Sequence, residues 1–317
     1  MKNPIKIYTI FLILLISSIT YGQKTHLDSL HVKIDNSVEL SMVINEYLDL
    51  SDSVEKDLKS LQSLLKDNSH IPNNSPFSIS FEPEKRLSIK QIEAVETIIL
   101  ENNTPASYHC INQCSILTDE YTLQIKFDKI ETLIADNRIH KVKKVIDTTS
   151  TVKGRFTKTY NYSFKGEKLI HNEKLDIVNG PMDLIILSGG VGVNLVKNQP
   201  VVDLTAELGL MFSNKGILKN QYYLSYNALS DFETNSKINL NGFANIGYRY
   251  NLSKNAKKSN WLGLELGYLV SRQGDFFENN TFRFGMNWKA GKYMSVSPQL
   301  YFSKDIAYPA LRIGFGF

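Results

Sequence analysis

Two cysteines and a histidine form the densest group of reactive side chains in this 317-residue sequence. His109, Cys110 and Cys114 lie together in the segment HCINQC. In an exported protein, which the amino terminus predicts, the oxidising compartment favours a disulfide between Cys110 and Cys114. A metal site on His109 and both thiolates is a second interpretation, although C-x3-C lacks the usual ligand spacing and no second Cys/His cluster completes it. Two free thiols are the third, and we expect neither a metal ion nor a cofactor.

Charged residues of the carboxy-terminal part form a second group, in which three acids and four bases alternate with apolar residues. Its members are Asp203, Glu207, Arg249, Glu265, Arg283, Lys289 and Arg312. If these strands close into a barrel, the charges point into a narrow interior, where unpaired ions are costly. We therefore predict salt-bridge networks, with Glu265 between Arg249 and Lys289. A gated proton or ion path through them is the alternative.

Motifs that carry catalysis are absent from the sequence. There is no glycine-rich phosphate loop, no H-E-x-x-H and no G-x-S-x-G. The acidic neighbours Asp119 and Glu120, like Glu82 and Glu84, are more typical of solvated turns than of an acid/base pair. The histidines are scattered along the chain: His26, His31, His70, His109, His140 and His171. We predict no catalytic residues and a protein that is not an enzyme.

The amino terminus has the pattern of a secretory signal peptide. Lys2 and Lys6 precede or flank an apolar stretch over residues 7–19, and small residues before position 23 allow cleavage after Gly22. The stretch is shorter than the ~20 residues of a spanning helix. No cysteine follows it, so a lipid anchor is not expected. Removing two lysines lowers the formal charge from +4 to +2, which gives no reason to expect nucleic acid binding.

Residues 23–180 mix helical and strand patterns and predict a periplasmic α+β domain. Apolar residues at spacings of three and four predict a helix over 40–65, with a new start at 51–53. This helix either packs on its own domain or offers a coiled-coil surface to a partner. A second helix is predicted over 88–99. Strands are predicted over 77–81, 121–127 and 155–164.

Residues 181–317 contain segments in which apolar residues alternate with glycine, serine, asparagine and a few charges. Such alternation over 9 to 11 residues is typical of strands that cross a bilayer in a barrel. A soluble β-sandwich also alternates, but its polar face would be rich in lysine and glutamate. A ten-stranded barrel that adds 155–164 and 168–178 is a further alternative. The eight predicted strands are 184–195, 201–212, 222–229, 238–250, 262–271, 281–289, 294–303 and 309–317.

This pattern resembles the small outer-membrane barrels of Gram-negative bacteria, of the OmpA/OmpX type or the porin-like families. The terminal Phe317, with Phe315, is similar to the signal that the barrel-assembly machinery reads in those proteins. The match is partial, because Arg312 stands where the signal usually has a glycine. Barrel enzymes of this size use a histidine beside a serine, and no histidine follows His171.

The resemblance and the patterns together predict an α+β domain followed by an all-β, eight-stranded antiparallel transmembrane barrel. We expect a non-enzymatic outer-membrane protein whose barrel anchors a periplasmic interaction domain for envelope assembly, secretion or cell-wall contact. The expected partners are outer-membrane lipid, the barrel-assembly machinery, and a periplasmic protein or the cell wall. A surface recognition or adhesion protein, or a narrow channel, is the alternative.

Overall fold

The computed structural model divides the chain into two compact units, residues 26–180 and residues 181–317. The predicted signal peptide, residues 1–22, lies outside the described residues. No helix within the described ranges has the length and apolar character that crossing a bilayer requires. The structure describes residues 27–67, 76–91, 95–99, 105–109, 112–133, 135–150, 154–180, 183–232, 238–290, 293–304 and 306–316.

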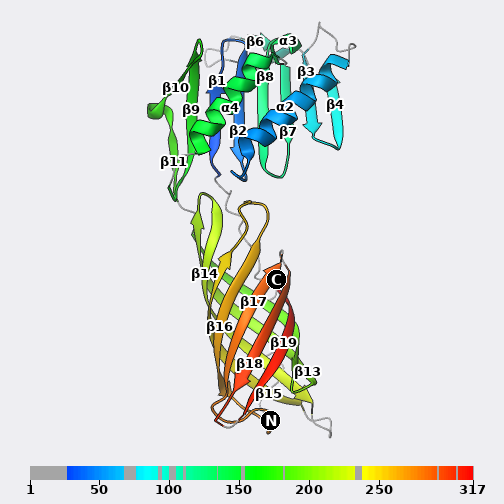
Figure 1. The fold of residues 1–317 in the computed structure, drawn as a ribbon, viewed down its shortest axis with the longest axis vertical. Coiled ribbons are helices and arrows are strands. Elements are labelled where there is room, and N and C mark those ends of the chain that lie inside the picture. Colours follow the sequence, from blue (N-terminus) through cyan, green and yellow to red (C-terminus); the bar gives the residue numbers. More distant parts are fainter. Residues whose placement is uncertain are drawn as a thin grey trace. The chain divides into compact units, whose positions relative to one another are not determined.

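The amino-terminal unit is built on a nine-stranded mixed sheet with the order β10-β9-β1-β2-β8-β7-β3-β4, and β11 also pairs with β9 (Figure 1). β5 (Val95–Ile99) and β6 (Pro105–His109) pair separately. The strands of the large sheet are β1 (Ser29–Lys33), β2 (Val38–Ile44), β3 (Phe77–Glu82), β4 (Arg86–Gln91), β7 (Asn112–Leu117), β8 (Tyr121–Phe127), β9 (Thr157–Lys165), β10 (Lys168–His171) and β11 (Ile177–Asn179).

Two helices, α2 (Leu50–Asp67) and α4 (Asp136–Ser150), cover one face of this sheet (Figure 1). The apolar residues of α2 recur every three or four positions, so they share the face that packs on the strands. Five of them are buried: Leu50, Val54, Leu58, Leu61 and Leu65. A short α3 (Ile130–Leu133) and a 3-10 turn, η1 (Glu173–Leu175), complete the helical segments described.

The strand order has an internal two-fold symmetry. One half of the unit consists of β1, β2, α2, β3 and β4, and the other half of their counterparts β7, β8, α4, β9 and β10, in that order. Exchanging each element with its counterpart gives the same strand order read from the opposite edge of the sheet. β2 and β8 pair antiparallel around the axis, with Ser41 opposite Gln124 in the middle. The strand after each helix lies parallel beside the other half, β3 on β7 and β9 on β1. The unit is therefore a pair of interlocked repeats, each completing the sheet of the other.

Two helix predictions in this unit are wrong. Residues 38–44 form β2, so only the part after the predicted restart at 51–53 is helical. The spacing of three and four included residues from opposite faces of this strand: Leu40 is buried, whereas Val43 is 41% exposed. The segment 88–99 lies mostly in β4 and β5 rather than in a helix. Helix α4 was not predicted.

The carboxy-terminal unit is a closed barrel in which eight strands pair antiparallel in chain order and β19 pairs with β12. β9, β10 and β11 belong to the other sheet, so the ten-stranded alternative is wrong. The sandwich alternative is wrong because a single sheet closes on itself. The strands are β12 (Leu184–Val196), β13 (Gln199–Asn214), β14 (Ile217–Phe232), β15 (Ile238–Asn251), β16 (Asn260–Ser271), β17 (Phe282–Ala290), β18 (Met294–Phe302) and β19 (Ala307–Gly316).

We call the end of the barrel where β12 begins and β19 ends the near end, and the opposite end the far end. A two-residue turn joins β12 to β13 at the far end, with φ of 51° at Lys197 and 62° at Asn198. Another joins β13 to β14 at the near end through Lys215 and Gly216, also with positive φ. Turns with two positive φ values match the right-handed twist of the strands they join. These turns keep long strands in register.

Candidate functional site

The lumen of the barrel holds ion pairs between strands. Arg312 donates to both carboxylate oxygens of Asp203, Nε to Oδ2 at 2.5 Å and Nη2 to Oδ1 at 2.9 Å. Arg249 likewise donates to Glu207, Nη1 to Oε1 at 2.7 Å and Nη2 to Oε2 at 2.8 Å. Each pair is bidentate and spans two strands that are not neighbours. The pairs therefore tie distant parts of the barrel wall together.

The third acid has a different partner from the predicted one. Glu265 accepts a hydrogen bond from Arg283 Nη2 at 2.7 Å, and no ion pair to Arg249 or Lys289 is formed among the described residues. Register explains the difference. Arg283 pairs with Gly267 on β16, which has no side chain, so its guanidinium is free to lie along the strand toward Glu265. The predicted placement of Glu265 between Arg249 and Lys289 is wrong.

Neutral polar side chains share the guanidinium of Arg283, which is only 1% exposed and whose Nε has no hydrogen-bond partner among the described residues. Its Nη2 donates to Asn227 Oδ1 and to Asn245 Oδ1, both at 2.6 Å. Tyr223 donates to the other oxygen of Glu265 at 3.2 Å. Asparagine and tyrosine thus act here as ligands of buried charges, and removing one member of such a network leaves an unpaired ion.

An aromatic cluster fills the far end of the lumen. Phe277, from the connection between β16 and β17, is fully buried and contacts Phe243 and Tyr301, with ring centroids 5.2 Å and 5.4 Å apart. Arg272 Nε donates to the backbone oxygen of Phe277 at 2.7 Å. Lys197 Nζ donates to the oxygen of Phe276 at 2.7 Å. The connection is therefore fastened over the mouth with its phenylalanine inserted.

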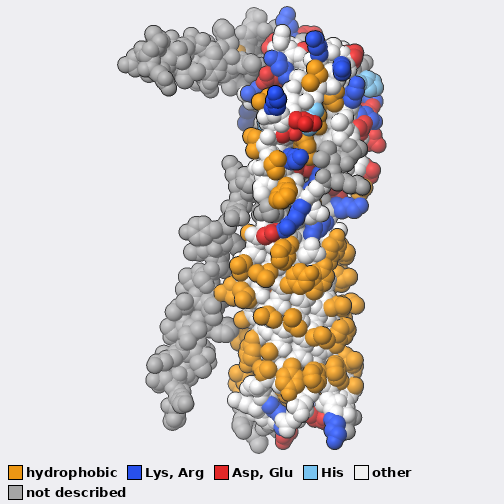
Figure 2. Space-filling model, turned by 90° about the vertical axis from the view of Figure 1, so that its left-hand side faces the viewer, with side chains coloured by type: hydrophobic (Ala, Val, Ile, Leu, Met, Phe, Trp, Pro, Cys, Tyr) orange, Lys and Arg blue, Asp and Glu red, His pale blue; other side chains and the backbone are white. Residues whose placement is uncertain are grey.

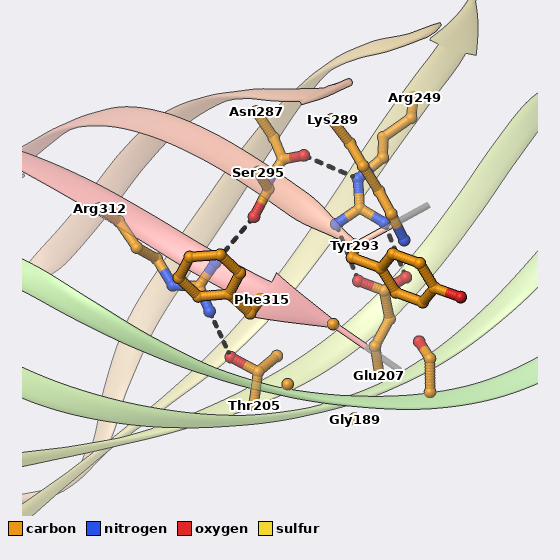
Figure 3. A pocket seen from close by; sticks show the side chains of 13 residues that line it. Gly189, Thr205, Glu207, Arg249, Asn287, Lys289, Tyr293, Ser295, Arg312 and Phe315 are labelled. Atoms are coloured by element: carbon orange, nitrogen blue, oxygen red, sulfur yellow. Dashed lines mark hydrogen bonds and ion pairs between the residues drawn. The ribbon is translucent and has the colours of Figure 1, made fainter. Parts of the chain in front are cut away.

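A pocket of about 60 Å³ opens among lumen residues toward the near end (Figure 3). Arg249, Lys289 and Arg312 reach it from three strands, β15, β17 and β19. Glu207 is the one acid that lines it. The other lining residues are small or uncharged: Ser188, Gly189, Gly190, Thr205, Asn287, Tyr293, Ser295, Phe315 and Gly316.

The outer face of the barrel is apolar. In register, one continuous line of paired residues crosses seven strands, and every member is apolar and between 40% and 61% exposed. Figure 2 shows the resulting band of hydrophobic side chains across the face of the barrel in view, with charged side chains below it at one end. The line consists of Leu187, Leu208, Leu224, Ile246, Leu266, Phe284 and Leu300.

Aromatic rings gather toward both ends of this outer face. Toward the near end, Tyr222 contacts Phe212 and Tyr248, with centroids 6.1 Å and 5.0 Å apart. Toward the far end, Tyr268 contacts Phe282 at 4.9 Å. The Tyr268 hydroxyl donates to the side chain of the adjoining loop residue Asn280 at 2.8 Å. Rings with an apolar body and a polar tip at both margins of an apolar band are typical of membrane interfaces.

The cysteine cluster lies only partly within the described residues. Cys110 is outside them, as is the side chain of His109. Cys114 is buried with a free thiol, and burial raises its pKa to about 12. The free thiol of Cys114 does not fit the predicted disulfide, whose other member, Cys110, is the residue that lies outside the described ranges. Over the described ranges, histidine, cysteine and acidic side chains form no group suited to a metal ion.

Of the two residues predicted as a barrel-assembly signal, only one lies within the described residues. Phe315 lies on β19 and is 51% exposed, while Phe317 is outside the described residues. The role of Phe277 was not predicted from the sequence. Its signal was two adjacent phenylalanines, Phe276 and Phe277, in an otherwise polar connection.

The carboxy-terminal unit is thus a closed antiparallel eight-stranded barrel in whose lumen polar side chains are hydrogen-bonded to one another, and it is compatible with an outer-membrane barrel. Searches against protein families, curated proteins and solved structures found no match to this chain.

Proposed function

We propose that this chain is an integral outer-membrane protein whose barrel, residues 181–317, anchors an α+β periplasmic interaction domain, residues 23–180. The observation that carries the proposal is the inversion of the barrel: apolar side chains outside, ions and amides inside. Monomeric soluble proteins rarely expose contiguous apolar patches beyond a few hundred Å². A bilayer is the solvent in which such a surface is stable, and a closed barrel leaves no strand edge unpaired there.

Anchoring is better supported than transport. An eight-stranded lumen is just wide enough for side chains to fill. Here Arg283 and its partners occupy the middle, and Phe277 occupies the far mouth. Catalysis has little support, since both oxygens of Asp203 and of Glu207 accept hydrogen bonds from an arginine, so each carboxylate is held in an ion pair. We therefore favour a structural role for these residues.

The interaction role falls to the amino-terminal unit. α2 and α4 cover one face of its sheet, and on the other face His31, Val43 and Gln124 are exposed. At the far end of the barrel, β12 and β13 are joined by the two-residue turn at Lys197 and Asn198, and the longer connection over 272–281 is folded into the mouth of the barrel. Large ligand-capturing loops are thus missing from the described far end, which favours a periplasmic partner over a surface adhesion role.

Cell fractionation tests the proposal. The full chain with its leader is produced in a Gram-negative host, and membranes are separated and washed at high pH. We expect the protein in the outer-membrane fraction, extractable only with detergent. Protease should spare it in intact cells, and after the outer membrane is permeabilised should remove the amino-terminal unit while leaving a fragment that begins near residue 181. Recovery in the soluble fraction would overturn the proposal.

A further inference from the structure

Lys289, in the lumen of the barrel, forms no ion pair with any described residue. Lys289 lines the pocket toward the near end, and no hydrogen bond or ion pair of its amine is formed with any described residue. The three acids of the central network each bond to an arginine. A further buried acid, Asp231, lies near the far end of the barrel, away from Lys289. It accepts hydrogen bonds from Asn239 and Asn241. Glu207 attracts the charge of Lys289, but Glu207 is already paired with Arg249, which repels Lys289.

The nearest acids are already engaged by arginines. Both oxygens of Glu207 accept from Arg249, and Oε1 also accepts from Gln221 Nε2 at 2.8 Å. Asp203 is held in the same way by Arg312. Within the pocket lining, three cations face one carboxylate, and adding Asp203 behind Arg312 still leaves an excess of one positive charge.

The pocket also has neutral polar groups and space. Ser295 and Thr205 point their hydroxyls toward the guanidinium of Arg312 (Figure 3), with Thr205 at 3.0 Å and Ser295 at 3.5 Å. Glycines on β12 leave the wall without side chains. A volume of about 60 Å³ is roughly twice the ~30 Å³ share of a water molecule in the liquid. That is room for an oxyanion group.

We propose that this pocket binds a phosphate-type oxyanion, with Lys289 as its principal cation and the two arginines and neighbouring hydroxyls around it. The anion supplies the counter-charge that the described lumen side chains do not provide. Ammonium groups bind phosphate as point charges, and hydrogen bonds between ionised groups are among the stronger ones in proteins. The phosphate comes either from solution or from a lipid head group, and the experiment separates these sources.

The test uses the purified full-length protein in a neutral maltoside detergent. Thermal unfolding is followed by circular dichroism while inorganic phosphate replaces chloride at constant ionic strength. We expect phosphate to raise the unfolding temperature of the barrel, and isothermal calorimetry to give a saturable site. In Lys289→Gln, affinity should fall at least tenfold and the stabilisation should vanish. The matched control is Lys254→Gln, which removes a charge from an exposed lysine in the loop between β15 and β16 and should leave binding unchanged.

A second arm replaces inorganic phosphate with a short-chain phosphatidylglycerol in the same detergent. Stabilisation by phosphate alone assigns the site to a soluble ion, and stabilisation by the lipid alone assigns it to a head group. Without either ligand, Lys289→Gln should be at least as stable as the wild type, because it removes a charge that repels Arg249. If neither ligand stabilises the wild type, or if both stabilise Lys289→Gln equally, the proposal is wrong. Fractionation addresses the membrane location separately.

Discussion

The two units use the same alternating strands in opposite ways. In β8, Tyr121, Leu123 and Phe127 are buried against the helices, while the residues between them are polar and face outward. In β16, Leu264 and Leu266 are half exposed, and the small or charged residues between them line the interior. The alternation of apolar and polar residues indicates only that a strand has two different faces. Which face is the inside depends on what the other elements place there.

The polar lumen also changes what holds each unit together. The amino-terminal unit buries one apolar cluster drawn from helices and strands. The barrel has a smaller apolar cluster near its far end, and much of its interior relies on bonded ions and amides. A buried apolar contact tolerates partial loss, whereas a buried charge that loses its partner does not. The largest expected effects of substitution therefore lie in the barrel lumen.

The strongest test of this contrast is Arg283→Ala. Because it leaves Glu265 buried without a cation and strips Asn227 and Asn245 of their donor, we expect a loss of about 3–5 kcal/mol in the free energy of unfolding. Urea titration in micelles measures it. Adding Glu265→Gln should recover part of that loss. A single variant as stable as the wild type would show that the network contributes little.

The second-largest loss of stability is expected from removing the ring of Phe277 at the far end of the lumen. Phe277→Ala deletes a fully buried ring from the cluster with Phe243 and Tyr301, which should cost about 3 kcal/mol. It should also widen the far mouth, so single-channel recordings in planar bilayers should detect more frequent openings than in the wild type. Phe276→Ala, on the partly buried neighbour, is the control. Equal conductance in all three proteins would argue against a sealing role for Phe277.

One substitution placed in both units sharpens the comparison further. Leu266→Arg puts a charge on the outer band of the barrel and should cost about 2 kcal/mol in bilayers, the lower end of values for lipid-facing arginine. Val43→Arg, also on an exposed apolar strand position, should change stability by less than about 0.5 kcal/mol, because that side chain faces water. Unfolding of both variants in lipid vesicles gives the difference. Similar costs at both sites would contradict a membrane environment for Leu266.

The smallest effect concerns the surface contact between the two helices. Lys143 on α4 donates to Glu55 on α2 at 2.6 Å, and this bond, together with one from Lys59, holds the pKa of Glu55 at about 2. Since this pKa lies below the ordinary value of 4.5, the stabilisation is complete above about pH 4.5 and is lost as the pH falls toward 2.

In Lys143→Met, the unfolding temperature should therefore decline less steeply between pH 4.5 and pH 2 than in the wild type. Thermal scans of the full chain across this range measure the slope. Lys56→Met is the control, because its 3.5 Å pair with Glu84 joins two highly exposed side chains. A parallel decline in wild type and Lys143→Met would remove the role given to this contact.

The sequence was most informative where one pattern ran unbroken. Each barrel strand alternates over many residues, so the eight segments were placed within a few residues of β12 to β19, apart from β14, which begins five residues earlier than predicted. It was least informative at residues 38–44, where apolar residues next to a real helix allowed a helical spacing to be extended into a strand. The interlocked repeats could not be recognised in the sequence either. β2 and β8 share a burial pattern, but only one aligned position has the same residue in both, Leu40 in β2 and Leu123 in β8.

By itself, the sequence determined which side chains share a face of each strand, since that follows from the geometry of an extended chain. It thus grouped the charges of the barrel on one side and its apolar residues on the other. Only the tertiary structure decided the pairing of Glu265 with Arg283, the insertion of Phe277 and the isolation of Lys289. These depend on register, closure and loop conformation, which bring together residues far apart in the chain, and no local pattern encodes such distances.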